Sequence, residues 1–257
     1  MKKIGIYTGF SRHIPLYERL YAIKASGFNT VCLNFEKELI STETKPQNQV
    51  CLADKCGLPV EAAHLTGSYS NALWDNTDKN AVDLITEEIK LLDNLQIPVG
   101  VLHVTWGLKA PCTPSTKALE NFLKIAEAAE KYNVKIAFEN SVSAQHLQFV
   151  LDNIKTDNIG FCYDSGHENA FTPNTNYLHL YSDRLFAMHL HDNDGKNDLH
   201  LLPFADEGTV NWQEKVALLK RSELWNNSII LEAENQSTPL NAFLESAYKS
   251  AVRLNSI

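Results

Sequence analysis

Strand and helix patterns alternate along the whole chain, and this alternation restricts the possible folds more than any other feature. Eight short apolar runs have the composition of buried strands, and amphipathic stretches lie between them. The runs are KIGIYTG (3–9), TVCLNF (30–35), PVEAAHL (59–65), PVGVLHV (98–104), VKIAFEN (134–140), IGFCYDSGH (159–167), LFAMHLHD (185–192) and SIILEAEN (228–235). Apolar residues recur at helical spacing between them, for example at Ile85, Ile89, Leu92 and at Phe122, Leu123, Ala126. This alternation predicts an α/β fold with a parallel sheet.

The length of the chain fits a closed barrel. It has 257 residues, and ~250 residues are typical of a (β/α)8 barrel. An open, doubly wound sheet is the main alternative, and it would gather ligands at one crevice between two strands. No linker, repeat or low-complexity tract divides the sequence. We therefore predict a single (β/α)8 TIM-barrel domain over residues 1–257.

Six of the eight runs end on a side chain that can bind a divalent cation. These side chains are His64, His103, Glu139, Asp164, His189 and Glu232. Barrel enzymes have their active sites at the carboxyl ends of the strands. Ligands spread over six strand ends favour a closed ring, in which all these ends meet at one site.

The residue types indicate which metals fit. Carboxylate oxygens together with imidazole nitrogens suit Mn²⁺, Zn²⁺, Co²⁺ or Fe²⁺. No cysteine accompanies them, so a structural zinc site with thiolate ligands is not expected. The strongest set is Glu139, Asp164, His189 and Glu232, because four unrelated roles would otherwise have to coincide at four strand ends.

Further donors extend this set. His167 lies in the turn after the sixth run, and Asp198 and His200 lie in a long polar loop. Taken singly, His64 or His103 is more often a hydrogen-bonded packing histidine than a ligand. For Asp198 and His200 the structural role and the ligand role are equally supported.

Other polar residues near these ends have weaker signals. Glu207 and Glu234 are additional carboxylates, and Glu234 shares a strand face with Glu232 because side chains repeat every two residues. His191 alternates with Leu190 and is expected to be a neighbour of the ligands rather than a ligand. Three histidines are expected on the surface or on helices, namely His13, His146 and His179.

Aromatic residues and loops surround the predicted site. Rings that can stack on the apolar C–H faces of a sugar, or close the barrel mouth, are Phe10, Tyr69, Trp74, Trp106 and Phe204. Residues 40–59 and 192–211 are expected to be irregular, and the second stretch is long and polar, as functional loops often are. Lys109 and Lys196 are weak candidates to meet a substrate phosphate.

The amino-acid composition restricts the kinds of partner and substrate that the protein can bind. The formal charge is −8, whereas proteins that grip nucleic acid through its phosphates usually have an excess of Lys and Arg. A nucleic-acid partner is therefore not expected, and a small neutral or polyol substrate is favoured. No signal peptide and no apolar run of the roughly 20 residues that a membrane helix needs is present. With five irregularly spaced cysteines interpreted as reduced thiols, we predict a cytoplasmic protein without membrane contact.

Five motifs resemble those of one protein group. IAFEN, CYDSGH, MHLHDN, DLHLLPF followed by GTVNW, and IILEAEN are similar in order and spacing to the xylose isomerase-like TIM-barrel superfamily. This group contains sugar phosphate isomerases and epimerases and also endonuclease IV. The resemblance covers essentially the whole chain. The stretch FADEGTVNW, which contains Asp206, departs from the more common glycine-rich form of that loop.

The resemblance implies two ligand sets. In the epimerases of this group, one divalent metal has four ligands, which match Glu139, Asp164, His189 and Glu232. The histidine after the aspartate, here His167, contacts the substrate in those enzymes. In endonuclease IV, a cluster of three zinc ions has further ligands, which match His64, His103, Asp198 and His200.

Two functions follow as hypotheses. The leading one is a divalent-metal-dependent isomerase or epimerase of a small ketose, inosose or related sugar, with or without a phosphate. The metal would stabilise an enediolate while Glu139 and Glu232 transfer protons at opposite faces and His167 orients a hydroxyl. The alternative is an endonuclease IV-like zinc phosphodiesterase acting on abasic DNA. A barrel that binds a ligand without turnover, and an oligomeric form of the protein, are left open.

Overall fold

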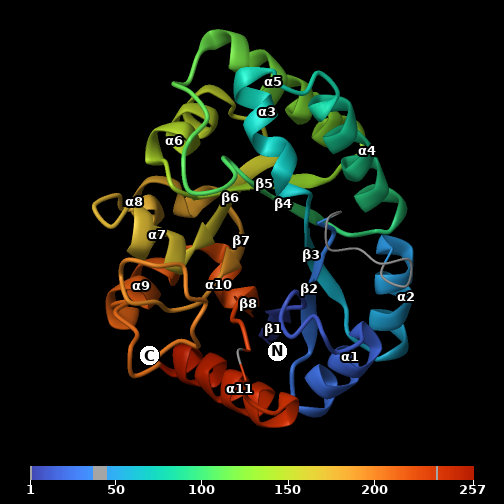
Figure 1. The fold of residues 1–257 in the computed structure, drawn as a ribbon, viewed down its shortest axis with the longest axis vertical. Helices are drawn as coiled ribbons and strands as arrows, with labels where there is room; N and C mark the ends of the chain where they lie inside the picture. Colours follow the sequence, from blue (N-terminus) through green and yellow to red (C-terminus); the bar gives the residue numbers. More distant parts are fainter. Residues whose placement is uncertain (1, 37–44, 236) are drawn as a thin grey trace.

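Eight parallel strands form one sheet that curves into a nearly closed barrel (Figure 1). The structure is a computed structural model and describes residues 2–36, 45–235 and 237–257. Within these residues the strands are β1 (Lys3–Tyr7), β2 (Thr30–Asn34), β3 (Val60–His64), β4 (Val99–His103), β5 (Lys135–Glu139), β6 (Ile159–Asp164), β7 (Leu185–His189) and β8 (Ser228–Leu231). Their order is β7-β6-β5-β4-β3-β2-β1-β8. Each predicted run contains one of these strands, so the predicted barrel is confirmed.

The ring closes at the carboxyl ends of the strands. The residue that follows β7, Leu190, donates its N–H to the Ile230 carbonyl at 3.0 Å and accepts from the N–H of Glu232 at 3.2 Å. Leu190 also pairs with Leu231 in an isolated parallel bridge. The seam between β7 and β8 is thus tied directly beside His189. This fixes the two strand ends relative to one another at the predicted site.

Helices surround the barrel on its outer face (Figure 1). In the described residues they are α1 (Leu16–Ala25), α2 (Pro46–Lys55), η3 (Gly67–Tyr69), α3 (Ser70–Asp75), α4 (Ala81–Asn94), α5 (Thr116–Lys131), α6 (Ala144–Asn153), α7 (Ser165–Phe171), α8 (Tyr177–Tyr181), η4 (Ser182–Arg184), α9 (Trp212–Leu219), α10 (Glu223–Asn227) and α11 (Leu240–Ser256). None of these helices is long and apolar enough to cross a bilayer.

One expected loop is largely helical. Residues 40–59 were expected to be irregular, but α2 occupies Pro46–Lys55. Its first residue is a proline, whose missing N–H costs nothing at this position because the first turn of a helix has no acceptor for it. Residues 37–44, which include the start of the expected loop, lie outside the described part of the chain.

The helices pack apolar stripes onto the strands. In α4, Ile85, Ile89 and Leu92 are fully buried, as their spacing predicts. Gly100 of β4 makes room for this helix, because a Cβ there would lie 2.6 Å from Leu92 Cδ1. Leu123 of α5 is an exception to the predicted stripe and is 42% exposed. Each of the five cysteines, all within the described residues, is an unpaired thiol.

Candidate metal centre

Four buried donors converge where strands β5 to β8 end. Glu139, Asp164 and His189 are the last residues of β5, β6 and β7, and Glu232 directly follows β8. One ligand atom from each residue lies within 4.8 Å of those of the other three. All four side chains are buried. The barrel therefore brings together the four residues that the sequence marked as the strongest set.

His189 lies between two carboxylates. Its Nδ1 is 2.8 Å from Glu139 Oε1 and 2.9 Å from Glu232 Oε2. One ring N–H can point fully at only one acceptor, so His189 alone satisfies the two carboxylates incompletely. Burial by itself raises the pKa of Glu139, but the charge of His189 and its hydrogen bond outweigh it and hold this pKa well below its usual range. The two carboxylates and His189 thus surround one common point.

The chemistry of the donors fits a divalent cation. Three carboxylates beside a single imidazole are costly to bury unless further positive charge compensates them. Oxygen and nitrogen donors in this ratio suit Mn²⁺, Zn²⁺, Co²⁺ or Fe²⁺. A cation at their common point would replace the incomplete pairing by His189. The residues that would hold it are Glu139, Asp164, His189 and Glu232.

A second group of donors shares Glu139. His64 Nε2 and His103 Nε2 each lie 3.2 Å from Glu139 Oε2, and the two rings are 4.6 Å apart. Burial lowers the pKa of His103 to about 3, so this imidazole is neutral near pH 7 and offers a lone pair. Its buried Nδ1 has no hydrogen-bond partner among the described residues. The three side chains can therefore form another cation site next to the first.

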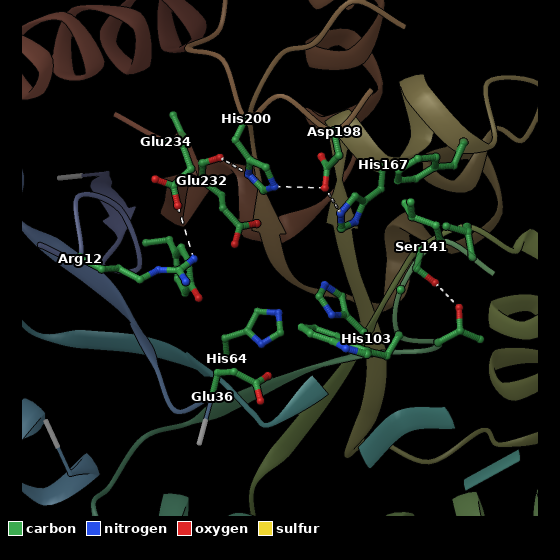
Figure 2. Close-up of a pocket in the computed structure, with 18 residues that line it drawn as sticks. Arg12, Glu36, His64, His103, Ser141, His167, Asp198, His200, Glu232 and Glu234 are labelled. Atoms are coloured by element: carbon green, nitrogen blue, oxygen red, sulfur yellow. Dashed lines mark hydrogen bonds and ion pairs between the residues drawn. The ribbon is translucent and has the colours of Figure 1, made fainter. Parts of the chain in front are cut away.

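A third group joins His167 of α7 to Asp198 and His200 of the long loop after β7. His167 Nε2 and His200 Nε2 each lie 3.2 Å from Asp198 Oδ2, as the dashed lines in Figure 2 show. Burial by itself lowers the pKa of His200, but the hydrogen bond to Asp198 raises it to about 9. This group contains the two loop residues for which the sequence supported a ligand role and a structural role equally.

The donors open onto a cavity of about 390 Å³ (Figure 2). His167, His200 and Glu232 are in its wall. Glu139 is not in the wall; it is fully buried and contacts His64 and His103, which are. The two glutamates to which the sequence assigned the same kind of role therefore differ in their access to a ligand.

Of the five aromatic rings expected near the site, Trp106 alone lines the cavity among the described residues. Its ring lies 5.2 Å from that of His103. The Asn71 side chain fixes its backbone with two hydrogen bonds of 2.9 Å, and a Cβ at Gly67 would lie 2.4 Å from the indole. The other four rings are buried in the core or pack against it, namely Phe10, Tyr69, Trp74 and Phe204. Three charged candidates also lie outside the wall, namely Lys109, Lys196 and Glu207.

A family model described as the xylose isomerase-like TIM barrel matches residues 20–253. The chain belongs to this family. Among curated relatives, the "Uncharacterized protein y4fM" of Sinorhizobium fredii is 31% identical over 196 residues, which are 71% of this chain and 58% of that protein. The "Probable endonuclease 4" of Mesoplasma florum is 27% identical over 150 residues, which are 51% of this chain and 50% of that protein. The chain thus spans about half the length of the curated relatives it matches.

Solved structures share the barrel. A D-tagatose 3-epimerase-like protein superimposes with a TM-score of 0.71 at 20% identity, covering 99% of this chain and 98% of that one. An IolI protein with a bound zinc atom superimposes with a TM-score of 0.72 at 14% identity, covering 98% of this chain and 96% of that one. At these identities the likeness concerns the xylose isomerase-like fold.

Several residues that line the cavity of this family member were not singled out from the sequence, among them Tyr7, Glu36 and Arg12. Tyr7 is the last residue of β1, and Glu36 lies two residues after β2. Their position at strand ends is the signal that selects the six ligands, and it would have found these two as well. Arg12 lies in the loop after β1, where no local pattern predicts which way a side chain points.

The sequence predicts His191 to be a neighbour of the ligands rather than a ligand, but ligand atoms of His191, His200 and Glu232 lie within 4.8 Å of one another, so His191 can also bind a cation. Its fully buried Nε2 lies 3.0 Å from Asp164 Oδ1, and its ring stacks on that of His200 at 4.0 Å. One residue, Leu190, separates His191 from His189, so both point to the same face. Of the histidines expected elsewhere, His146 is buried on α6 and hydrogen-bonds to Ser143 Oγ.

Asp192 holds the loop that carries Asp198 and His200. Its carboxylate accepts from the indole N–H of Trp212 at 2.7 Å and from the backbone N–H of Val210 at 3.0 Å. The Asp192 backbone also pairs with Leu201 through two hydrogen bonds. The polar stretch 192–211, which the sequence predicted to be a functional loop, is thus pinned by one buried carboxylate.

Gly208→Ala should loosen this loop. A Cβ at Gly208 would lie 2.4 Å from Asp192 Cγ, and Trp212 and Val210 hold that carboxylate so that it cannot withdraw. We expect the free energy of unfolding to fall by about 2 kcal/mol, together with loss of any cation bound at Asp198. Thermal denaturation and elemental analysis measure the two effects. Asp206→Ala, at an exposed position of the same loop, is the control, and equal melting temperatures for the two variants would contradict the expectation.

Proposed function

We propose that this xylose isomerase-like barrel is a metal-dependent isomerase or epimerase of a small hydroxycarbonyl sugar. The observation that carries the proposal is the position of Glu232, which joins the buried donor group and also faces the cavity. A carboxylate in this position can take a proton from a bound substrate. The cavity, at about 390 Å³, is of the size that holds small ligands.

Each residue has a task in this proposal. When bound by Glu139, Asp164, His189 and Glu232, a divalent cation supplies Lewis acidity to a substrate carbonyl. Glu232 takes the proton from the carbon next to that carbonyl. His167 lines the cavity and orients a substrate hydroxyl. Glu139 is fully buried outside the wall of the cavity, so it helps to hold the cation and does not reach the substrate, and Glu232 itself returns the proton.

The second candidate is an endonuclease IV-like zinc phosphodiesterase. Two observations favour it: both additional donor groups, around Glu139 and around Asp198, are complete, and one relative is named as a probable endonuclease 4. The charge around the cavity does not favour a nuclease. Among the described residues in the wall, Arg12 is the one Lys or Arg, whereas a protein that grips DNA needs several.

The two candidates predict different products. With Mn²⁺ or Co²⁺ restored after chelation, we expect the protein to exchange solvent deuterium into one or more sugars of a ketose panel, because a carbon-bound proton is removed and returned. We expect no cleavage of a duplex that contains an abasic site. Elemental analysis of the same sample gives the number of bound ions. Cleavage of the abasic duplex by a zinc-loaded sample that leaves every sugar unexchanged would replace the first proposal by the second.

A further inference from the structure

An ion pair at the edge of the cavity takes no part in the metal groups. Arg12 Nη2 lies 3.5 Å from Glu234 Oε1, and both side chains line the cavity. Figure 2 shows the pair on the opposite side of the view from Ser141, with the donor residues between them. Both side chains are partly exposed, so a ligand can reach them. The pair is in the wall of the cavity that the proposed substrate would occupy.

The local structure holds Arg12 in place. Its Nε donates to the Gly9 carbonyl at 2.7 Å. The buried guanidinium of Arg19 supports the same loop from inside, because it donates to the Phe10 carbonyl at 2.9 Å and to the Ile14 carbonyl at 3.0 Å. These bonds leave Arg12 Nη1 without a hydrogen-bond partner among the described residues.

Glu234 is held as well. Its backbone N–H donates to the His200 carbonyl at 2.8 Å, which ties it to the loop of the third donor group. The Arg12 donor and the Glu234 acceptor therefore lie side by side in the wall of the cavity, 3.5 Å apart. A hydroxyl group both donates and accepts, so neighbouring hydroxyls of a sugar match this pair without a change in net charge.

A phosphate does not match the pair. Arg12 is the one Lys or Arg among the described residues of the wall, and Glu234 already compensates its charge. Three further carboxylates, Glu36, Asp198 and Glu232, line the same cavity. A phosphate at Arg12 would meet the carboxylate of Glu234, and like charges placed together at a binding surface are strongly unfavourable.

We propose that the Arg12–Glu234 pair binds hydroxyl groups at the far end of the substrate and selects an unphosphorylated sugar. The inference rests on the proposed function, since it assigns the substrate class of the same cavity. Arg12 supplies the hydrogen-bond donor, and Glu234 supplies the acceptor and the negative charge that excludes phosphate. Glu234 is thus the residue that decides between a sugar and a sugar phosphate.

Binding of matched probes tests this assignment. D-fructose and D-tagatose are each paired with their 6-phosphates, and dissociation constants are measured by calorimetry on the metal-loaded protein. The wild-type protein should prefer the neutral member of each pair. Glu234→Gln keeps the size of the side chain and frees Arg12 from its counter-charge, so it should shift the preference toward the phosphate by about tenfold or more. Arg12→Gln should weaken binding of the neutral probe without any gain for the phosphate.

Control variants separate this inference from the proposed function. Glu127→Gln makes the same charge change at an exposed position of α5 and should leave both preferences as in the wild type. A Glu234→Gln preference within about twofold of this control, in a protein that exchanges deuterium into sugars, would overturn the inference alone. A wild-type protein that binds and exchanges no probe of the panel would overturn the proposed function and the inference with it.

Discussion

Glu232→Gln should abolish solvent deuterium exchange into the substrate sugar. The amide keeps the shape of the side chain but is not a base, and Glu232 is the carboxylate of the four-donor group that faces the cavity. A positioned general base contributes about 10²–10⁴ in rate, so we expect a loss of at least ~10²-fold. Mass spectrometry of recovered sugar measures the exchange.

The loss should be specific to proton transfer. In the Glu232→Gln variant the amide oxygen still faces His189, so the fold and a cation, at reduced affinity, should be retained. Circular dichroism and elemental analysis check both. Glu223→Gln, exposed on α10, is the matched control. Exchange at more than about one tenth of the wild-type rate in Glu232→Gln would rule out this carboxylate as the base.

Glu139→Gln should remove the stabilisation that a bound cation provides. The four-donor group and the group with His64 and His103 both contain Glu139, so its loss weakens both at once. A ligand at a hundred times its dissociation constant stabilises the folded state by about 2.7 kcal/mol. At roughly 2–4 °C per kcal/mol for a protein of this size, adding Mn²⁺ or Zn²⁺ to chelated wild-type protein should raise the melting temperature by roughly 5–10 °C.

The Glu139→Gln variant should show almost none of this shift. In the wild type, the Glu139 carboxylate accepts from His189 and also contacts His64 and His103, so no neighbouring side chain can replace it. Glu130→Gln, exposed on α5, should respond to the cation as the wild type does. A full cation-dependent shift in Glu139→Gln, measured by differential scanning calorimetry, would show that the cation binds elsewhere.

The barrel and the strand-end residues were accessible to sequence reasoning because both depend on local patterns. The side-chain repeat of a strand and its end are encoded within five or six neighbouring residues. In a closed parallel barrel all carboxyl ends lie on one face. The meeting of the four donors could therefore be predicted without knowing any long-range contact. The structure brings together, within 4.8 Å, ligand atoms of Glu139, Asp164, His189 and Glu232.

Loop residues were predicted less well because distant contacts orient them. Phe10 and Trp74 were expected at the barrel mouth, but both are buried in the core. Asp192 gave no sign in the sequence that it pins the loop of Asp198 by accepting from Trp212. Nothing in the spacing of residues within a loop says which partner, far along the chain, will turn a side chain inward.

The sequence by itself determined the barrel, the face on which its donors gather and the kind of cation they suit. Only the tertiary structure decided that Glu232 faces the cavity while Glu139 is buried, and that Arg12 meets Glu234 at its edge. The reason is that strand periodicity fixes the face on which a side chain lies. The exposure of that side chain, and the charged group that pairs with it, depend on other segments of the chain. Only the closed ring brings those segments side by side.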